Sequence, residues 1–61
     1  MEYYDIRRLA LVFSKIARME SMKIENEIRK MAGQAPAYGE QDFTGIQIDL
    51  ENLAYCHNEQ L

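Results

Sequence analysis

Much of what normally stabilises a small protein is missing from this chain. It has a single cysteine, Cys56, so a disulfide within the chain is excluded. With one cysteine and one histidine, a structural zinc site would need at least two carboxylate ligands, an unusual set. A chain of 61 residues makes one domain and buries only about 60% of its unfolded surface. Association with a second copy is the remaining source of stability.

Long apolar runs and export signals are also missing. No apolar run approaches the ~18 residues needed to cross a bilayer. The N-terminus MEYYDIRR carries two acids before its first base, which differs from a secretory signal. The unpaired cysteine agrees with a reducing compartment. We therefore expect a cytoplasmic protein that does not enter a membrane.

Bases are absent from the second half of the chain. All seven Lys and Arg residues lie between Arg7 and Lys30, whereas residues 31–61 carry five acids and no base. This asymmetry suggests that the halves attract each other or a partner. A nucleic-acid-binding domain often has a pI above about 9, whereas the sequence pI here is 4.9. Nucleic acid is therefore not the expected partner.

Residues 2–32 are predicted to form one long helix. The segment has no Gly or Pro and is rich in strong helix formers. Arg29 and Lys30 in the last turn complement the helix dipole, and Gly33 follows as the residue that ends the helix. The predicted helix is about 45 Å long, more than a monomeric hairpin of this size requires.

Residues 33–43 are predicted to be a loop, with Tyr38 as its anchor onto the helices, and residues 44–60 a second helix. In the second segment Ile46, Ile48 and Leu50 alternate with polar residues, as in a strand. Thr44 and Gln47, however, have the spacing of a helical capping box, and the chain offers no second strand as a partner. The helix is preferred.

The expected fold is all-α, a helix–loop–helix hairpin over residues 1–61 that dimerises into an antiparallel four-helix bundle. Its core would come from the main apolar face of the first helix and from the apolar stripe of the second. The core or dimer-interface residues are Ile6, Leu9, Phe13, Ile16, Glu20, Ile24, Ile28, Met31, Ile46, Leu50, Leu53 and His57. Glu20 occupies a position of this face where a Leu would be expected. It either fixes the register or oligomeric state, or lies solvated and paired with a base at a gap between core layers or at the symmetry axis of the bundle.

The opposite face of the first helix mixes apolar residues with bases, the composition of a protein-binding surface. The alternative is a solvated face with scattered apolar residues. The candidate partner-binding residues are Tyr4, Arg7, Leu11, Lys15, Arg18 and Met22.

Catalysis has no support in the sequence. No glycine-rich phosphate loop or H-E-x-x-H motif is present. Cys56 and His57 are adjacent, so on a helix their side chains diverge by about 100° and do not form a nucleophile–base pair or share one metal. We expect a non-enzyme without metal or cofactor.

The chain resembles the small all-helical accessory proteins encoded in the early regions of temperate bacteriophages such as the lambdoid group. The segment MEYYDIRRLALVFSKIARMESMKIENEIRKM, the short loop and the acidic second helix carry this resemblance. It implies a modulator that acts by contact with host or phage proteins, in the cytoplasm of the bacterial host. No functional residues carry over from it.

The expected function is therefore protein–protein interaction, as a regulator or inhibitor of a larger host or phage protein. Two alternatives remain open. The chain could be a nucleic-acid-associated regulator that uses the basic stripe of its first helix, or a structural subunit that only self-assembles.

Overall fold

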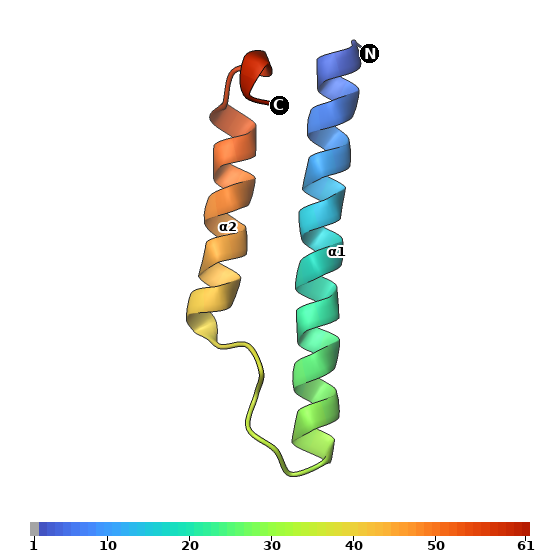
Figure 1. Ribbon diagram of the computed structural model, residues 1–61, viewed down its shortest axis with the longest axis vertical. Helices are drawn as coiled ribbons and strands as arrows, with labels where there is room; N and C mark the ends of the chain where they lie inside the picture. The colour runs from blue at the N-terminus through green and yellow to red at the C-terminus, as the bar shows by residue number, and fades with distance from the viewer. Residues whose placement is uncertain (1) are drawn as a thin grey trace.

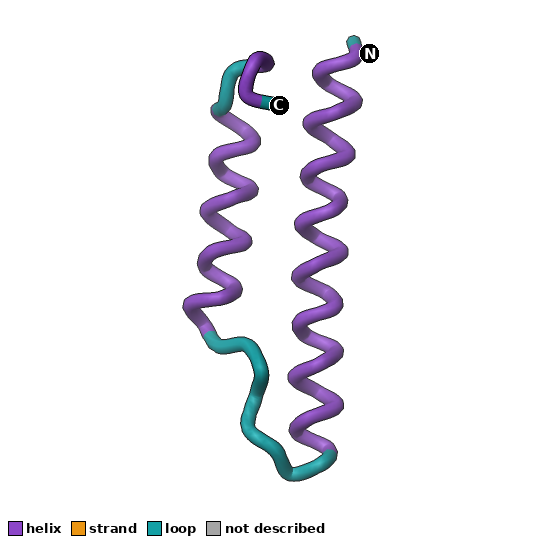
Figure 2. The backbone as a smooth tube through the Cα atoms, in the orientation of Figure 1, coloured by secondary structure: helices purple, strands orange, loops and turns teal. Residues whose placement is uncertain are grey.

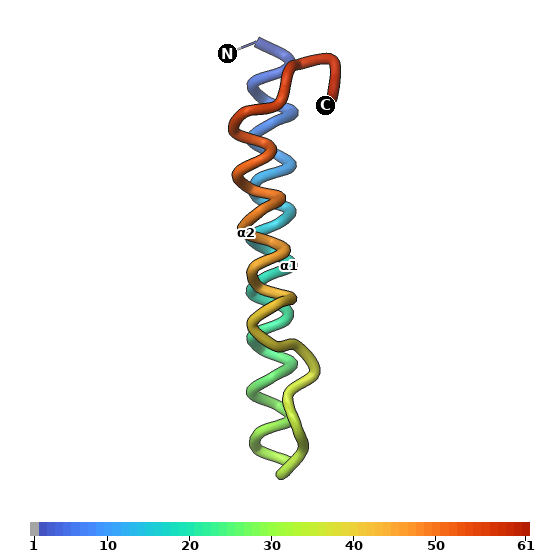
Figure 3. Tube along the Cα trace, turned by 90° about the vertical axis from the view of Figure 1, so that its left-hand side faces the viewer, coloured from blue at the N-terminus to red at the C-terminus, as the bar shows by residue number. Residues whose placement is uncertain are grey.

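The structure, a computed structural model, describes residues 2–61 and shows two helices lying side by side in opposite directions (Figure 1). Helix α1 covers Tyr3–Met31, α2 covers Glu40–Tyr55, and a short 3-10 helix, η1, covers Asn58–Gln60. No strand occurs in the part of the chain that is described (Figure 2). The view turned by 90° shows a thin rod (Figure 3), with extents of 47 × 19 × 11 Å. The all-α hairpin predicted from the sequence is confirmed.

Helix α1 lies within one residue of the predicted range at each end. Its C-terminal turn is closed by two backbone hydrogen bonds: the Gly33 N–H donates to the Lys30 carbonyl over 3.1 Å, and the Gln34 N–H donates to the Arg29 carbonyl over 2.8 Å. This pairing requires a left-handed residue after the helix, and Gly33 has φ +73°. Gly33 therefore ends α1 as predicted.

Helix α2 begins at Glu40, four residues before the predicted start at Thr44. Gly39 is extended and precedes the first turn, and its N–H donates to the Asp42 carboxylate over 2.9 Å. Acidic side chains in a first turn also complement the positive end of the helix dipole. The predicted capping box of Thr44 and Gln47 is therefore wrong, because the Gly39–Asp42 pair starts the helix one turn earlier.

The alternating apolar residues of the second segment lie on a helix. Ile46 is buried, Leu50 and Leu53 are half-buried, and Ile48 is 50% exposed. Phe43 is half-buried too. Ile46 therefore belongs to the core of the hairpin, Leu50 and Leu53 are partly covered beside it, and the helical interpretation of their spacing is correct.

Helix α2 ends at Tyr55, five residues before the predicted end. Cys56 and His57 both have extended backbone angles, with ψ of 153° and 155°. They break the helical periodicity that was expected to place His57 on the apolar stripe, and His57 is exposed. Its backbone N–H instead donates to the Gln60 side chain over 3.0 Å. His57, predicted for the core or dimer interface, is therefore not part of the core within one chain.

The face of α1 that packs on α2 is opposite to the predicted one. In the part of α1 that is described, the only residue below 9% exposure is Met22, at 3%. The half-buried residues on the same face are Arg8, Leu11, Val12, Lys15, Met19, Asn26 and Arg29. Leu11 and Met22 were predicted to bind a partner, and within the chain they pack between the two helices.

Candidate interaction surface

The outer face of α1 carries the most prominent apolar feature of the molecule. Seven large apolar residues recur there at helical spacing and are between 37% and 85% exposed. We call this set the outer α1 stripe; its members are Ile6, Leu9, Phe13, Ile16, Ile24, Ile28 and Met31. These are the residues that the sequence predicted for the core or dimer interface, and within one chain they are not core.

Helix geometry explains why the stripe is left uncovered. At 100° per residue, the centre of the outer α1 stripe lies about 160° away from the half-buried face around Lys15. A single helix such as α2 covers one of these faces and not the other. The stripe therefore faces away from α2 along nearly the whole length of α1.

Glu20 lies within the outer α1 stripe and is exposed. Its carboxylate accepts from the Lys23 ammonium over 3.2 Å, in a pair three residues apart whose side chains are 52% and 57% exposed. Such an exposed pair contributes at most about 1 kcal/mol. Within one chain, Glu20 is therefore neither buried nor strained.

The surface area of the chain is larger than its mass explains. A folded monomer of 7.2 kDa exposes about 4,100 Å² on average. The accessible surface here is 4928 Å². The excess of about 800 Å² agrees with the elongated shape of the hairpin, whose extents are 47 × 19 × 11 Å.

Arg8 joins the N-terminal part of α1 to the C-terminal end of α2. Its guanidinium donates to the carbonyl of Leu53, to the carbonyl of Cys56 over 3.1 Å and to the Asn58 side chain over 2.9 Å. It also lies 3.2 Å from the Cys56 sulfur. The last turn of α2 has no base of its own, so Arg8 satisfies its Leu53 carbonyl and complements the negative end of its dipole. Arg8 was not among the predicted site residues.

Lys15 forms the ion pair that joins the two halves of the chain. Its ammonium lies 3.0 Å from the Asp49 carboxylate on α2, with side chains 40% and 46% exposed. Lys15 and Asp49 also line a groove of about 290 Å³ between the helices, together with Leu11 and Leu53. The attraction between the basic and acidic halves, expected from the sequence, therefore operates inside the hairpin.

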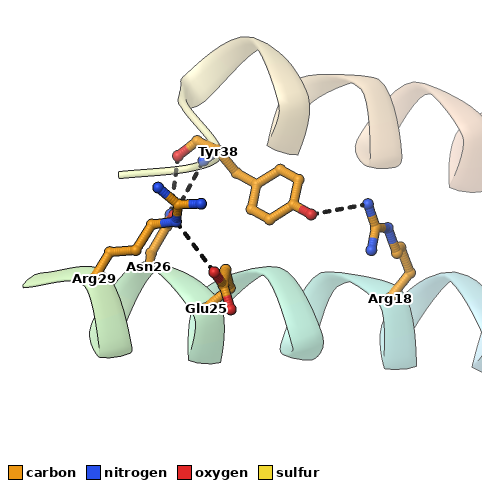
Figure 4. Close-up of polar contacts among 5 residues, drawn as sticks. All are labelled: Arg18, Glu25, Asn26, Arg29 and Tyr38. Atoms are coloured by element: carbon orange, nitrogen blue, oxygen red, sulfur yellow. Dashed lines mark hydrogen bonds and ion pairs between the residues drawn. The ribbon is translucent and has the colours of Figure 1, made fainter. Parts of the chain in front are cut away.

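Tyr38 anchors the loop on α1, as predicted (Figure 4). The Asn26 side chain donates to the Tyr38 carbonyl over 2.9 Å and accepts from the Tyr38 N–H over 3.0 Å. The Tyr38 hydroxyl points toward Arg18, whose guanidinium donates to it over 3.2 Å. Arg29 continues this group through its 3.1 Å bond to Glu25. Arg18 is therefore engaged with the loop.

The six predicted partner-binding residues do not form one exposed surface. Leu11, Lys15 and Met22 face α2, and Arg18 contacts the loop. The remaining two, Tyr4 and Arg7, are exposed near the N-terminus of α1, where they line a small hollow with η1. The prediction of one binding face is wrong because α2 and the loop cover most of it.

Comparisons with known proteins give no further lead. The chain matches no family model, no curated protein and no solved structure. None of the helices described is long and apolar enough to cross a membrane. Among residues 2–61, no three His, Cys, Asp or Glu side chains come together as a metal site.

Proposed function

We propose that this chain is a non-enzymatic protein–protein interaction module that docks through the outer α1 stripe. One observation carries the proposal: seven large apolar side chains lie exposed on one face along the length of α1. Single exposed apolar residues are ordinary on a protein surface. A row of seven on one face, interrupted only at Glu20, marks a binding site, because its exposure to water is unfavourable until a partner covers it.

The stripe accepts a partner of defined shape. A straight row of Ile, Leu, Phe and Met side chains along a helix fits an apolar helical face or groove, with anchors three and four residues apart. A regulator or inhibitor of a larger host or phage protein works in this way, and so does a dimer with four helices in one bundle. Both uses need the same surface.

Contacts within the hairpin disfavour the nucleic-acid alternative. Arg8, Lys15 and Arg18 bind α2 or the loop, and Lys23 and Arg29 pair with acids on α1. Nucleic acid would have to compete with these partners for phosphate contacts. The basic stripe of the first helix is therefore a poor surface for it.

Capture on immobilised protein tests the proposal. The immobilised chain is exposed either to a bacterial lysate or to a tagged free copy of the same chain, and the amount of bound protein is measured. We expect the double variant Phe13→Glu/Ile24→Glu to bind at least ten-fold less protein than the wild type. The matched control is Ile48→Glu, an apolar residue of similar exposure on α2. Circular dichroism verifies that each variant keeps its helices. Equal retention by the double variant and the wild type contradicts the proposal.

A further inference from the structure

Six of the seven members of the outer α1 stripe are spaced symmetrically along the helix, whereas the seventh, Ile16, would come level with Ser21 of an antiparallel copy. The six are Ile6, Leu9, Phe13, Ile24, Ile28 and Met31, and reading from either end gives steps of three and four, then eleven, then four and three. The centre of this pattern lies midway between residues 18 and 19. Reversal of the helix direction about that point exchanges Ile6 with Met31, Leu9 with Ile28, and Phe13 with Ile24.

From this symmetry we propose that the occupant of the outer α1 stripe is the same stripe of a second copy, packed antiparallel about a two-fold axis at the level of residues 18 and 19. The inference rests on the proposed function and names its partner. A two-fold interface requires that residue i meets residue j while j meets i. The reversed pattern meets this condition, because every large side chain at either end finds an apolar one at its own level.

The centre of the stripe suits a two-fold axis. There Glu20 comes level with Ala17 of the second copy, a residue small enough to leave room for the carboxylate. The two Glu20 side chains are offset by about 4.5 Å along the helices. Each Glu20 keeps its ion pair with Lys23 of the same chain at 3.2 Å. Two solvated ion pairs therefore lie near the axis, and two unpaired carboxylates do not face each other.

The charges at the ends of the stripe also match in the antiparallel arrangement. Asp5 and Lys30 lie on the same side of the stripe, about 20° apart in projection. A two-fold axis across an antiparallel pair brings like sides together. Asp5 then lies within about 3 Å, along the helix, of Lys30 in the second copy. A parallel pair in register would instead leave Asp5 about 38 Å, along the helix, from Lys30 of the second copy.

The position of α2 determines the shape of the dimer. Because α2 lies along one side of α1 (Figure 1) and the stripe faces the other side, the two long helices form the central pair of the dimer and the two short ones lie outside. The result is a layer of four helices instead of a square bundle.

Cysteine cross-linking tests the register. In a Cys56→Ser background, a tagged chain with Phe13→Cys is mixed with an untagged chain carrying Ile24→Cys and oxidised gently. We expect the mixed cross-link to exceed either self cross-link at least ten-fold. In the antiparallel register two copies of residue 13 lie about 16 Å apart along the helix, beyond the reach of a disulfide. Ile48→Cys on α2 is the matched control and is expected to give no cross-link.

Two results would overturn the inference. Dominant self cross-links of Phe13→Cys would show a parallel pair. A wild-type chain that sediments as a monomer at 100 µM and gives no mixed cross-link would show that a second copy is not the occupant. In that second case, capture of lysate proteins that is lost in Phe13→Glu/Ile24→Glu still upholds the interaction module. Equal capture by that variant would reject the module as well, so the two failures are distinguishable.

Discussion

At the scale of single residues, a few polar side chains decide which face of α1 meets α2. Arg8 binds the end of α2, and Lys15 binds Asp49 in its middle. Neither contact follows from local sequence pattern, because each joins residues more than thirty positions apart. One feature of the sequence could have indicated the role of Arg8. The last turn of the acidic second helix has no base of its own, so a base from another segment is expected to contact it.

Replacement of Arg8 tests this role. We expect Arg8→Met to lower the free energy of unfolding by about 1–2 kcal/mol, because the last carbonyls of α2 lose a charged donor. Urea denaturation measures the loss, and amide exchange locates it near Cys56. Arg7→Met is the matched control, since among residues 2–61 the polar contact of Arg7 is a long one, 3.5 Å to the Tyr3 hydroxyl. An equal effect of the two changes would contradict the role.

Met22 and Ile24 provide a direct comparison of the inner and outer faces. We expect Met22→Ala to cost about 2–4 kcal/mol, because it empties the most buried site of the hairpin. Ile24 is 59% exposed, so Ile24→Ala should change the unfolding free energy by less than about 0.5 kcal/mol in dilute, monomeric samples. Chemical denaturation measures both values. A larger loss of stability for Ile24→Ala than for Met22→Ala in monomeric samples would contradict the packing of the Met22 face against α2.

At the scale of elements, the sequence was sufficient for α1 and for the existence of α2. Composition, the dipole-compatible ends and Gly33 define the first helix almost completely. The start of α2 was missed because two capping signals compete, and the pair of Gly39 and Asp42 lies one turn before that of Thr44. The end was missed because the extended residue Cys56 has no sequence signal.

The loop depends on one side chain of α1. We expect Asn26→Ala to lower the unfolding free energy by about 1–2 kcal/mol, since both hydrogen bonds to the Tyr38 backbone are lost. Amide exchange at Tyr38 should accelerate at the same time. The matched control is Asn52→Ala, on an exposed position of α2. Unchanged exchange at Tyr38 in the Asn26 variant would contradict the anchoring role.

At the scale of the whole molecule, the face of α1 that binds α2 could not be chosen from the pattern. The sequence presents two stripes on α1, and the more apolar one was predicted to form the core. One short helix covers only one stripe, and the Lys15–Asp49 ion pair and the Arg8 hydrogen bonds all lie on the less apolar stripe that is covered. The α1 residues predicted for the core or dimer interface are therefore exposed, while three of the six predicted partner-binding residues, Leu11, Lys15 and Met22, lie between the helices.

Glu20 tests the centre of the proposed dimer. We expect Glu20→Leu to tighten self-association about ten-fold or more, because a Leu completes the apolar row and removes a charge that must otherwise stay hydrated. Sedimentation equilibrium measures the dissociation constant. Glu51→Leu, on an exposed position of α2, should leave it unchanged. Weaker association of Glu20→Leu would mean that Glu20 makes an attractive contact across the interface.

The mass of the chain in solution is the most direct test that the outer α1 stripe is an interface between two copies. Sedimentation equilibrium of the wild type and of Phe13→Glu/Ile24→Glu should be compared over a dilution series reaching 100 µM. We expect the wild type to approach the mass of two 7.2 kDa chains and the variant to remain a helical monomer. A wild-type chain that stays at 7.2 kDa throughout the series, with helicity equal to that of the variant, would contradict the dimer.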